Sequence, residues 1–469
     1  MGRRKKKVII LENVKIHGLA EKGRGVGKDS EGRVVFVERV VPGDEVDVKV
    51  SKKKSSYMEG YPLKFHKTSD LRIEPFCKHF GVCGGCTLQN LAYEQQLAFK
   101  QDHVLQTLKR IGKVEAEEYL PILPAESIQY YRNKLEFAFS NKRWLTKEEI
   151  DSDVSNLEDV LGFHKRGAFD KILNIDHCHL QADPSNQVRN DIKALAVEMG
   201  LSFHDVRAHE GLMRHILMRT TTLDQNMMIV SFFEDDQEAI KKLLDQVIKK
   251  NPQLTSVFYC INPKLNDFLL DLEMHHYFGD PWIEEKLRDV TFRIGPKSFF
   301  QTNTKQAVRL FEVVEKFAGL TGNENVYDLY TGIGSIALFL ASQCAQVVGI
   351  EEVEAAIEDA KLNCDLNGIK NAIFYAGDVK NLLTEEFVLE HAAPDVLITD
   401  PPRAGMHSKV IDLLREMKVP KIVYVSCNPA TQARDIQLLS DLYTLKKVQP
   451  VDMFPHTHHI ECVALLTLK

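Results

Sequence analysis

A cysteine near the end of the chain lies where a predicted strand meets a predicted helix. The apolar, β-branched residues 422–425 are typical of a buried parallel strand, and Asn428 and Pro429 favour the start of a helix. Cys427 then lies at the carboxyl end of a strand, where ligands bind in open α/β sheets. We expect the helix terminus to lower the pKa of its thiol and to favour a nucleophilic thiolate. The alternative is a buried packing cysteine, which is what most cysteines are.

An acid near the C-terminus, Glu461, precedes the last apolar run, residues 462–466. A thiolate and a base are the pair needed to methylate carbon 5 of a uracil ring, which is a poor nucleophile by itself. Addition of the thiolate to carbon 6 makes an enolate whose carbon 5 attacks a methyl sulfonium. The base then removes the proton from carbon 5, so that the thiol can leave. Cys427 and Glu461 are therefore the candidate catalytic pair.

Polar or glycine residues follow four predicted strands between residues 325 and 405. The first strand leads to a turn with Gly332 and Gly334, and glycines let the backbone approach a ligand closely. The next three end at Glu351, suited to ribose hydroxyls, at Asp378, suited to an adenine amine, and at Asp400. This layout predicts a site for S-adenosylmethionine. A nicotinamide-dependent dehydrogenase is the competing class, and the missing third glycine counts against it.

Three cysteines, Cys77, Cys83 and Cys86, lie in a glycine-containing loop, separated by five and then two residues. Clustered thiolates bind soft metals, either zinc or an iron–sulfur cluster. Both need a fourth ligand, and Cys178, in a short polar turn, is the best candidate. Spacing alone leaves zinc and the cluster open, although the first gap is wider than in the usual zinc knuckle. We expect the metal to be structural, because nothing near the three cysteines supplies a redox partner.

The N-terminal part of the chain is basic, although the whole chain has a formal charge of −6. Residues 1–75 hold 18 Lys and Arg against 11 Asp and Glu. Short β-like runs alternate with glycine turns between residues 8 and 70, which predicts a small barrel. Lys52, Lys53, Lys54, Tyr57 and Tyr61 supply phosphate contacts and stacking surface. We therefore expect a polyanion partner, most simply a nucleic acid.

The chain of 469 residues is too long for a single core. We predict a multidomain protein: an OB-like β-barrel over residues 1–72, an α+β central domain with a metal over 73–290, and an α/β Rossmann-like domain over 291–469. Within the central domain, a helix over 93–112 should pack on a larger neighbour. No run spans a bilayer and no secretory signal is present, so we expect a cytoplasmic protein with no membrane contact. No obligate protein partner is evident.

Several segments resemble the signatures of the RNA (uracil-5-)-methyltransferase family. They are Asp400-Pro401-Pro402-Arg403-Ala404-Gly405, Val425-Ser426-Cys427-Asn428-Pro429-Ala430-Thr431, His458-His459-Ile460-Glu461 and Phe299-Phe300-Gln301-Thr302-Asn303. The N-terminal glycine pattern, with Pro42-Gly43-Asp44, resembles a TRAM domain, an RNA-binding barrel. The four cysteines are similar to those of the branch that methylates 23S rRNA.

The resemblance implies a fold, a cofactor set and a role for each matching residue. Cys427 would be the nucleophile and Glu461 the proton acceptor, and the four cysteines would hold a 4Fe–4S cluster. The cofactor pocket would include Gln301, Tyr330, Ser335, Glu351 and Asp400, and substrate contacts would come from Arg132, Phe299 and Asp400. The helix over 93–112 would dock on the methyltransferase domain. The sequence departs from the family at Thr331 and Ser335, where Cys and Asn are frequent, which weakens the prediction for Ser335.

The leading hypothesis is methyl transfer from S-adenosylmethionine to carbon 5 of a uridine in 23S rRNA. Methylation of an exocyclic base amine is the alternative reaction, because Asp400-Pro401-Pro402 is similar to the acid–proline–proline loop of such enzymes, which need no thiol. A catalytically inactive RNA-binding protein with a structural metal is the alternative class.

Overall fold

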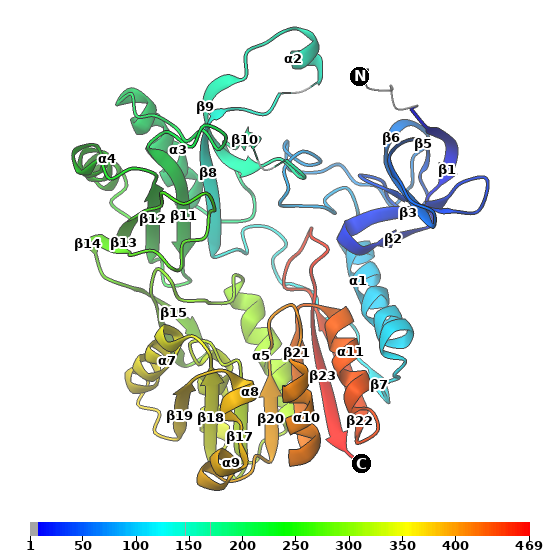
Figure 1. Cartoon of the computed structure of the whole chain (residues 1–469), viewed down its shortest axis with the longest axis vertical. Helices are drawn as coiled ribbons and strands as arrows, with labels where there is room; N and C mark the ends of the chain where they lie inside the picture. Colours follow the sequence, from blue (N-terminus) through cyan, green and yellow to red (C-terminus); the bar gives the residue numbers. More distant parts are fainter. Residues whose placement is uncertain (1–7, 146, 169) are drawn as a thin grey trace, which may run out of the picture.

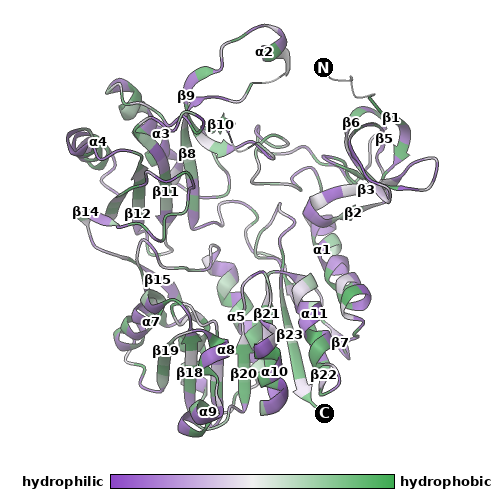
Figure 2. Ribbon diagram, viewed as in Figure 1, coloured by the Kyte–Doolittle hydropathy of each residue, from purple (hydrophilic) through white to green (hydrophobic). Residues whose placement is uncertain are grey.

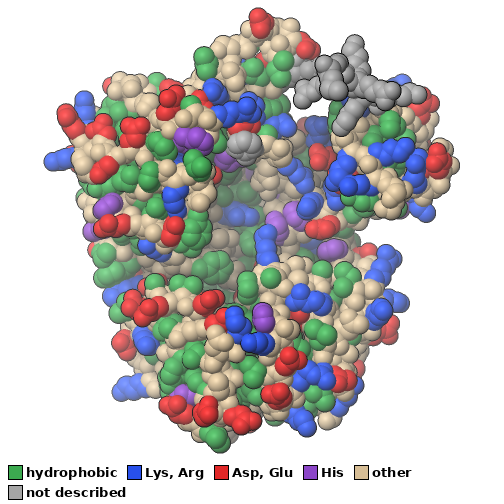
Figure 3. Space-filling model, in the orientation of Figure 1, with side chains coloured by type: hydrophobic (Ala, Val, Ile, Leu, Met, Phe, Trp, Pro, Cys, Tyr) green, Lys and Arg blue, Asp and Glu red, His purple; other side chains and the backbone are tan. Residues whose placement is uncertain are grey.

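The structure, a computed structural model, describes residues 8–145, 147–168 and 170–469. An N-terminal β-domain and a central α+β domain lie on one side, and the C-terminal α/β domain lies on the other (Figure 1). A space-filling view shows a hollow where the three regions meet, with Lys, Arg and His side chains around it (Figure 3). None of the described helices combines the length and apolar character needed to cross a membrane.

The N-terminal domain is a six-stranded sheet of order β1-β5-β6-β4-β3-β2. Alternating valines such as Val35, Val37, Val46 and Val48 point inward and are fully buried, as the two-residue period of a half-buried strand requires. Gly25 permits this packing, because a Cβ there would lie 2.3 Å from Val40 Cγ2. The elements are β1 (Ile10–Lys15), β2 (Gly18–Ala20), η1 (Glu21–Gly23), β3 (Arg24–Lys28), β4 (Val34–Val37), β5 (Glu45–Lys53) and β6 (Tyr57–Lys67).

The central domain is a seven-stranded sheet of order β10-β9-β8-β11-β12-β13-β14, with helices α3 and α4 packed on one face. Neighbouring strands are antiparallel except for β12 and β13. The predicted α+β arrangement of this domain therefore agrees with the sheet. The elements are β8 (Lys134–Lys142), α2 (Lys147–Asp151), β9 (Leu157–His164), β10 (Ile172–Asn174), α3 (Ser185–Glu198), β11 (Met213–Thr220), β12 (Asn226–Phe232), α4 (Gln237–Lys250), β13 (Ser256–Ile261) and β14 (His275–Gly279).

The C-terminal domain has an eight-stranded sheet of order β19-β18-β17-β20-β21-β23-β22-β7. Its strands are strongly apolar in the hydropathy view (Figure 2), as expected for a sheet covered on both faces. The hairpin β15 (Ile283–Leu287) and β16 (Val290–Ile294) leads into it. The other elements are α5 (Thr304–Ala318), β17 (Asn325–Leu329), α6 (Ser335–Leu340), η3 (Ala341–Gln343), β18 (Gln346–Glu351), α7 (Glu354–Leu366), β19 (Ala372–Ala376), α8 (Val379–Leu382), α9 (Glu385–His391), β20 (Val396–Thr399), α10 (Ser408–Met417), β21 (Lys421–Ser426), α11 (Pro429–Leu439), β22 (Tyr443–Val451) and β23 (Glu461–Leu468).

A segment from the first quarter of the chain completes this C-terminal domain. Helix α1 (Tyr93–Thr107) continues as a π-turn, η2 (Leu108–Gly112), and both pack beside α11, while β7 (Glu118–Tyr119) pairs with β22 and forms the edge of the sheet. The predicted helix is present, and polar as well as apolar side chains form its buried face. The residues that are most buried are Gln96, Lys100, Val104 and Leu108, whereas Ile111 is 49% exposed.

Candidate active site

The sheet register places Cys427 and Glu461 at the same sheet edge. Strands β21 and β23 are antiparallel, and the last pair of partners is Ser426 with Cys462. Cys427 follows Ser426 directly, and Glu461 directly precedes Cys462. One further step along both strands therefore brings the thiol and the carboxyl to facing positions. The predicted catalytic pair is brought together by two strands that are adjacent in the sheet.

The thiol of Cys427 is held in its protonated form, which corrects the expected effect of the helix terminus. Burial, followed by the charges of Glu461 and Asp400, raises the pKa of Cys427 to about 11. Arg403 acts in the opposite direction, through its charge and a hydrogen bond. The dipole of one helix end is therefore outweighed by burial beside two carboxyl groups.

Three carboxyl groups with raised pKa values lie on neighbouring strand ends. Burial, followed by Asp400, raises the pKa of Glu461 well above its usual value. Burial, followed by Asp328, raises the pKa of Asp400 to about 7, and burial raises that of Asp328, on β17, to about 7 as well. These shifts mean that the site around these carboxyl groups disfavours further negative charge and favours a cationic ligand.

The loop after β20 is fastened to the start of α11. Asn428 caps this helix by accepting from the backbone N–H of Ala430, and its Nδ2 donates to the Arg403 carbonyl at 3.0 Å. Thr431 Oγ1 donates to the same carbonyl at 3.3 Å. The backbone of Arg403 is thus fixed beside the thiol, although its side chain was assigned no role from the sequence.

The predicted cofactor residues Tyr330 and Glu351 meet at the glycine turn after β17. Tyr330 has a positive φ of 65°, and its N–H donates to the Ile350 carbonyl at 2.9 Å. Glu351 Oε2 accepts from the Gly332 N–H at 3.1 Å. Positive φ at a residue that is not glycine is a strained conformation that clusters at ligand sites. The turn therefore has the features of a pre-formed binding loop.

The other predicted cofactor residues have different surroundings. Ser335 is the first residue of α6 and follows Gly334, which is the N-cap and has a positive φ of 80°. Asp378 caps α8 and forms an ion pair with Lys380. The carbonyl of Gln301 accepts from Asn133 Nδ2 at 2.8 Å. Asp378 thus already has partners of its own, whereas Ser335 and Gln301 are half-buried.

The predicted substrate residues Arg132 and Phe299 lie on the two segments that Asn133 joins. Asn133 follows Arg132, and its N–H donates to the Thr302 carbonyl at 2.9 Å. The Arg132 guanidinium lies 5.2 Å from the centre of the Phe454 ring, and its Nε has no hydrogen-bond partner among the described residues. Phe299 is 69% exposed, so its ring is available to a large ligand.

The four predicted metal ligands, Cys77, Cys83, Cys86 and Cys178, line a single cavity of about 30 Å³. Burial foremost raises the pKa values of Cys83 and Cys86 to about 12, and the neighbouring thiols add to it. The Gly85 N–H donates to Cys83 Sγ at 3.4 Å. Thiols that share one cavity fit a soft metal, because a metal ion supplies the positive charge that makes them thiolates.

Within the described ranges, the one set of three possible ligand atoms that lie within 4.8 Å of one another is His164, His215 and Asp267. No three of the four cysteine sulfurs therefore all lie within 4.8 Å of one another. The histidine set has an internal partner, because Arg214 Nη2 donates to Asp267 Oδ1 at 3.0 Å.

A groove of about 230 Å³ separates the N-terminal domain from the central domain. We call it the basic groove, and its lining includes Arg24, Arg39, Trp144, Lys165 and Arg166. The Arg166 guanidinium donates to the Lys22 carbonyl at 3.1 Å and so bridges the two domains. Basic side chains beside the half-buried Trp144 ring suit the backbone and bases of a single nucleic acid strand.

Two family profiles match the sequence. The one described as tRNA (uracil-5-)-methyltransferase matches residues 272–469, and that of the TRAM domain matches residues 11–63. The chain is 50% identical over 455 residues to an uncharacterized RNA methyltransferase of Bacteroides thetaiotaomicron, covering 96% of this chain and 100% of the relative. It is 50% identical over 461 residues to one of Porphyromonas gingivalis, covering 97% and 99%.

A solved structure matches over nearly the whole chain. It is the Pyrococcus abyssi tRNA (uracil-54, C5)-methyltransferase in complex with S-adenosyl-L-homocysteine. The two chains are 30% identical with a TM-score of 0.76, and the match covers 97% of this chain and 99% of that one.

Sequence reasoning did not identify Gln96, Lys100, Asp452 or Arg403 as parts of the site. Lys100 Nζ lies 2.5 Å from Asp452 Oδ1, and both side chains are buried. A helical lysine is usually solvated, so its type gives no signal of burial. The available signal is their spacing, because Gln96 and Lys100 are four positions apart on α1 and so lie on the same face of the helix.

Proposed function

Because the chain belongs to the RNA (uracil-5-)-methyltransferase family, whose members are S-adenosylmethionine-dependent enzymes, we propose that it methylates carbon 5 of a uridine through a covalent bond between Cys427 and carbon 6. The observation that carries the proposal is the register of β21 and β23, which puts a thiol and a carboxyl at facing positions. A nucleophile for carbon 6 and a base for the carbon 5 proton are the two groups that this reaction needs.

The proposed reaction proceeds in three steps: addition of the thiolate, methyl transfer and elimination. Cys427 releases its proton to solvent, and its sulfur forms a bond to carbon 6 while the electrons of the carbon 5–carbon 6 double bond move towards the carbonyl to give an enolate. Carbon 5 then forms a bond to the methyl carbon of the sulfonium, whose electrons return to sulfur to give neutral S-adenosylhomocysteine. Glu461 takes the proton from carbon 5, the double bond re-forms and the thiolate leaves. The net products are 5-methyluridine, S-adenosylhomocysteine and one proton.

The electrostatics of the pocket support a cationic methyl donor. Burial, followed by the charges of Glu461 and Asp400, raises the pKa of Cys427 to about 11, so a positive charge beside the two carboxyl groups favours both their ionisation and that of the thiol. The sulfonium supplies such a charge, and Arg403 adds a second. In this proposal the thiolate forms when both substrates are bound, which protects a free thiol from side reactions.

RNA that carries 5-fluorouridine tests the covalent mechanism. Fluorine on carbon 5 cannot be removed as a proton, so the enzyme must accumulate as an adduct that survives denaturing electrophoresis. Cys427→Ala should form no adduct, whereas Glu461→Gln should form it at a rate near that of wild type. Methylation of an exocyclic amine predicts no adduct with any variant, and an inactive RNA-binding protein predicts no S-adenosylmethionine binding by calorimetry.

For the cysteine site we propose a 4Fe–4S cluster held by Cys77, Cys83, Cys86 and Cys178. A mononuclear zinc site with Zn–S bonds of about 2.3 Å would place its sulfurs about 3.8 Å apart, whereas no three of these four sulfurs all lie within 4.8 Å of one another. The chemistry of the group would be structural, since it ties the loop of residues 77–86 to Cys178. Anaerobic purification should give a brown protein with about four irons per chain; a colourless protein with one zinc would refute the cluster.

For the RNA target we propose a uridine in 23S rRNA, bound in part by the basic groove. The cysteine site and the TRAM domain together support this choice, since both resemble the rRNA branch. A uridine in tRNA is the second candidate, favoured by the match to the Pyrococcus abyssi enzyme over 97% of this chain. Mapping of 5-methyluridine in both RNAs from a deletion strain decides, because only the true target loses its methyl group.

A further inference from the structure

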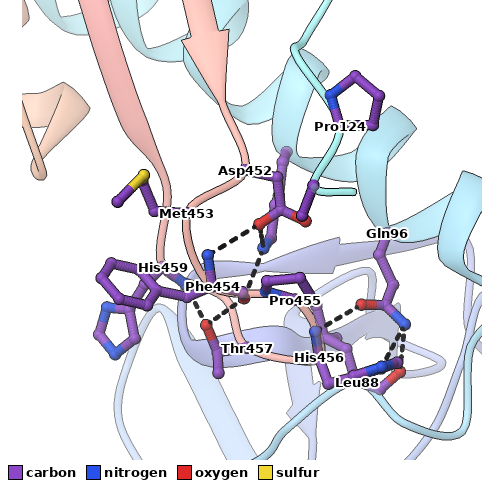
Figure 4. A network of polar contacts seen from close by, with 12 residues as sticks. Leu88, Gln96, Pro124, Asp452, Met453, Phe454, Pro455, His456, Thr457 and His459 are labelled. Atoms are coloured by element: carbon purple, nitrogen blue, oxygen red, sulfur yellow. Dashed lines mark hydrogen bonds and ion pairs between the residues drawn. The ribbon is translucent and has the colours of Figure 1, made fainter. Parts of the chain in front are cut away.

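The loop of residues 452–460, here called the base loop, joins β22 to β23 and leads directly into Glu461. Its own side chains hold its shape (Figure 4). Asp452 Oδ1 accepts from the Phe454 N–H at 3.2 Å, Thr457 Oγ1 donates to the Phe454 carbonyl at 2.8 Å, and it accepts from the His459 N–H at 3.2 Å. The loop therefore sets how the chain enters Glu461, whose backbone also pairs with Val451 of β22.

Gln96 of α1 holds the base loop at His456 (Figure 4). Its Oε1 accepts from the His456 N–H at 2.9 Å, and its Nε2 lies 3.2 Å from His456 Nδ1. The same Nε2 donates to the carbonyls of Leu88, at 3.0 Å, and Leu91, at 2.8 Å. Gln96 is fully buried, and His456 has a positive φ of 63°. A strained residue keeps such a backbone only while its surroundings hold it there.

The loop of residues 77–86, which carries Cys77, Cys83 and Cys86, is flanked by residues that contact His456 from the other side. The N–H groups of Thr87 and Leu88 donate to the His456 carbonyl at 2.8 Å and 3.0 Å. Thr87 directly follows Cys86, and Phe76, which directly precedes Cys77, packs its ring 5.0 Å from that of His456. Both ends of the loop that carries three of the four cysteines therefore touch the base loop.

We propose that Gln96, together with the backbone of Thr87 and Leu88, positions Glu461, and that the cysteine site affects the reaction through these contacts. The inference rests on the proposed covalent mechanism. Cys427 is followed by Asn428, whose Nδ2 donates to the Arg403 carbonyl, a contact that does not involve the base loop. Loosening the base loop therefore leaves thiol addition and methyl transfer intact and slows the removal of the carbon 5 proton.

The variant Gln96→Met tests this positioning role, and Gln101→Met is its matched control. Gln101 lies on the same helix, but its amide contacts the Leu120 carbonyl and the Ile122 N–H, away from the base loop. With ordinary RNA and S-adenosylmethionine, Gln96→Met should accumulate a covalent, methylated adduct and release tritium from 5-tritiated uridine at least tenfold more slowly than wild type. Gln101→Met should do neither, and both variants should form the 5-fluorouridine adduct at the wild-type rate.

Glu461→Gln serves as the reference for failed proton removal. If it accumulates adduct while Gln96→Met behaves like Gln101→Met, the positioning role is refuted and the covalent mechanism stands. If Glu461→Gln itself accumulates no adduct, the proposed catalytic roles are refuted. A uniform loss of both adducts in Gln96→Met would also refute the inference, because the helix contact would then be needed for every step.

The link to the cysteine site has its own test in the wild-type protein. Metal removal by a chelator should speed hydrogen exchange in peptides that cover residues 452–460 and should cause the same adduct to accumulate on ordinary RNA. Unchanged exchange in that loop, or tritium release at the wild-type rate, would refute the link.

Discussion

The buried ion pair between Lys100 and Asp452 gives a prediction of local stability. The side chains are 1% and 0% exposed, and Lys100 Nζ also donates to the Phe454 carbonyl at 3.1 Å. Lys100→Met keeps most of the side-chain volume but removes the ammonium group. Asp452 would then stay buried without its cation, at the junction between α1 and the C-terminal sheet.

The size of the effect follows from the partners that remain. Removing one member of a buried pair costs about 3–5 kcal/mol, because the other charge stays buried. Asp452 keeps two donors, the Tyr93 hydroxyl at 2.8 Å and the Phe454 N–H at 3.2 Å, so we expect the lower end, about 3 kcal/mol. Since about 1.4 kcal/mol is a factor of ten, the equilibrium for detaching α1 should rise roughly a hundredfold.

Hydrogen exchange of peptides from α1 and β22 measures this detachment directly. Lys446→Met is the control, because Lys446 pairs with Glu117 at 2.6 Å across the same junction, but their side chains are 39% and 56% exposed. An exposed pair contributes about 0–1 kcal/mol, so exchange should change by about threefold or less. Adding Asp452→Asn to Lys100→Met should restore part of the protection, since no charge is then left buried.

The reasoning fails if Lys100→Met and Lys446→Met speed exchange by the same factor. The attachment of α1 would then depend on its apolar contacts, such as those of Val104 and Leu108, and burial would not have strengthened the ion pair.

Three further predictions concern the thiol, the methyl donor and the RNA. In the free enzyme, alkylation of Cys427 by iodoacetamide should rise about tenfold per pH unit from pH 7 to 10, since a thiol with a pKa of about 11 reacts as its thiolate; a plateau near pH 8 would contradict the raised pKa. Asp400→Asn should weaken S-adenosylmethionine roughly tenfold by calorimetry but weaken neutral S-adenosylhomocysteine less, and equal losses would exclude a role for charge. Alanine at Arg39, Lys165 and Arg166 should lower RNA affinity and reduce the slope of log K against log salt by about one for each phosphate that no longer pairs with a basic side chain; an unchanged slope would place the RNA elsewhere.

Most of the fold could be predicted from hydrophobic pattern and turn chemistry. Residues 422–425 are apolar because β21 is covered on both faces, and Asn428 and Pro429 begin α11 as their chemistry requires. The strand-end positions of Glu351 and Asp400 follow from the same alternation of strands and helices. The register that brings Glu461 opposite Cys427 could not be read from the pattern, because it depends on β23 inserting between β21 and β22.

The polar contacts that hold the site could not be predicted from the sequence, for a physical reason. Gln96 and Lys100 are polar residues on a helix, and periodicity counts only apolar residues as buried. Their partners, His456 and Asp452, lie more than 350 positions away. The pKa of Cys427 was mispredicted for a related reason, since the helix terminus is local whereas the opposing carboxyl groups of Asp400 and Glu461 come from other strands.

The parallel pairing of β7 with β22 has a consequence for how the chain folds. The neighbouring ion pair joins Glu117 and Lys446, which are 329 residues apart. During synthesis, α1 and β7 emerge early and have no sheet to join until β22 has followed, so the N-terminal barrel can fold first and the C-terminal domain closes late. A fragment limited to residues 291–469 would leave the edge of β22 uncovered and Asp452 without a cation. The C-terminal domain is thus a single folded unit that is built from two chain segments synthesised at different times.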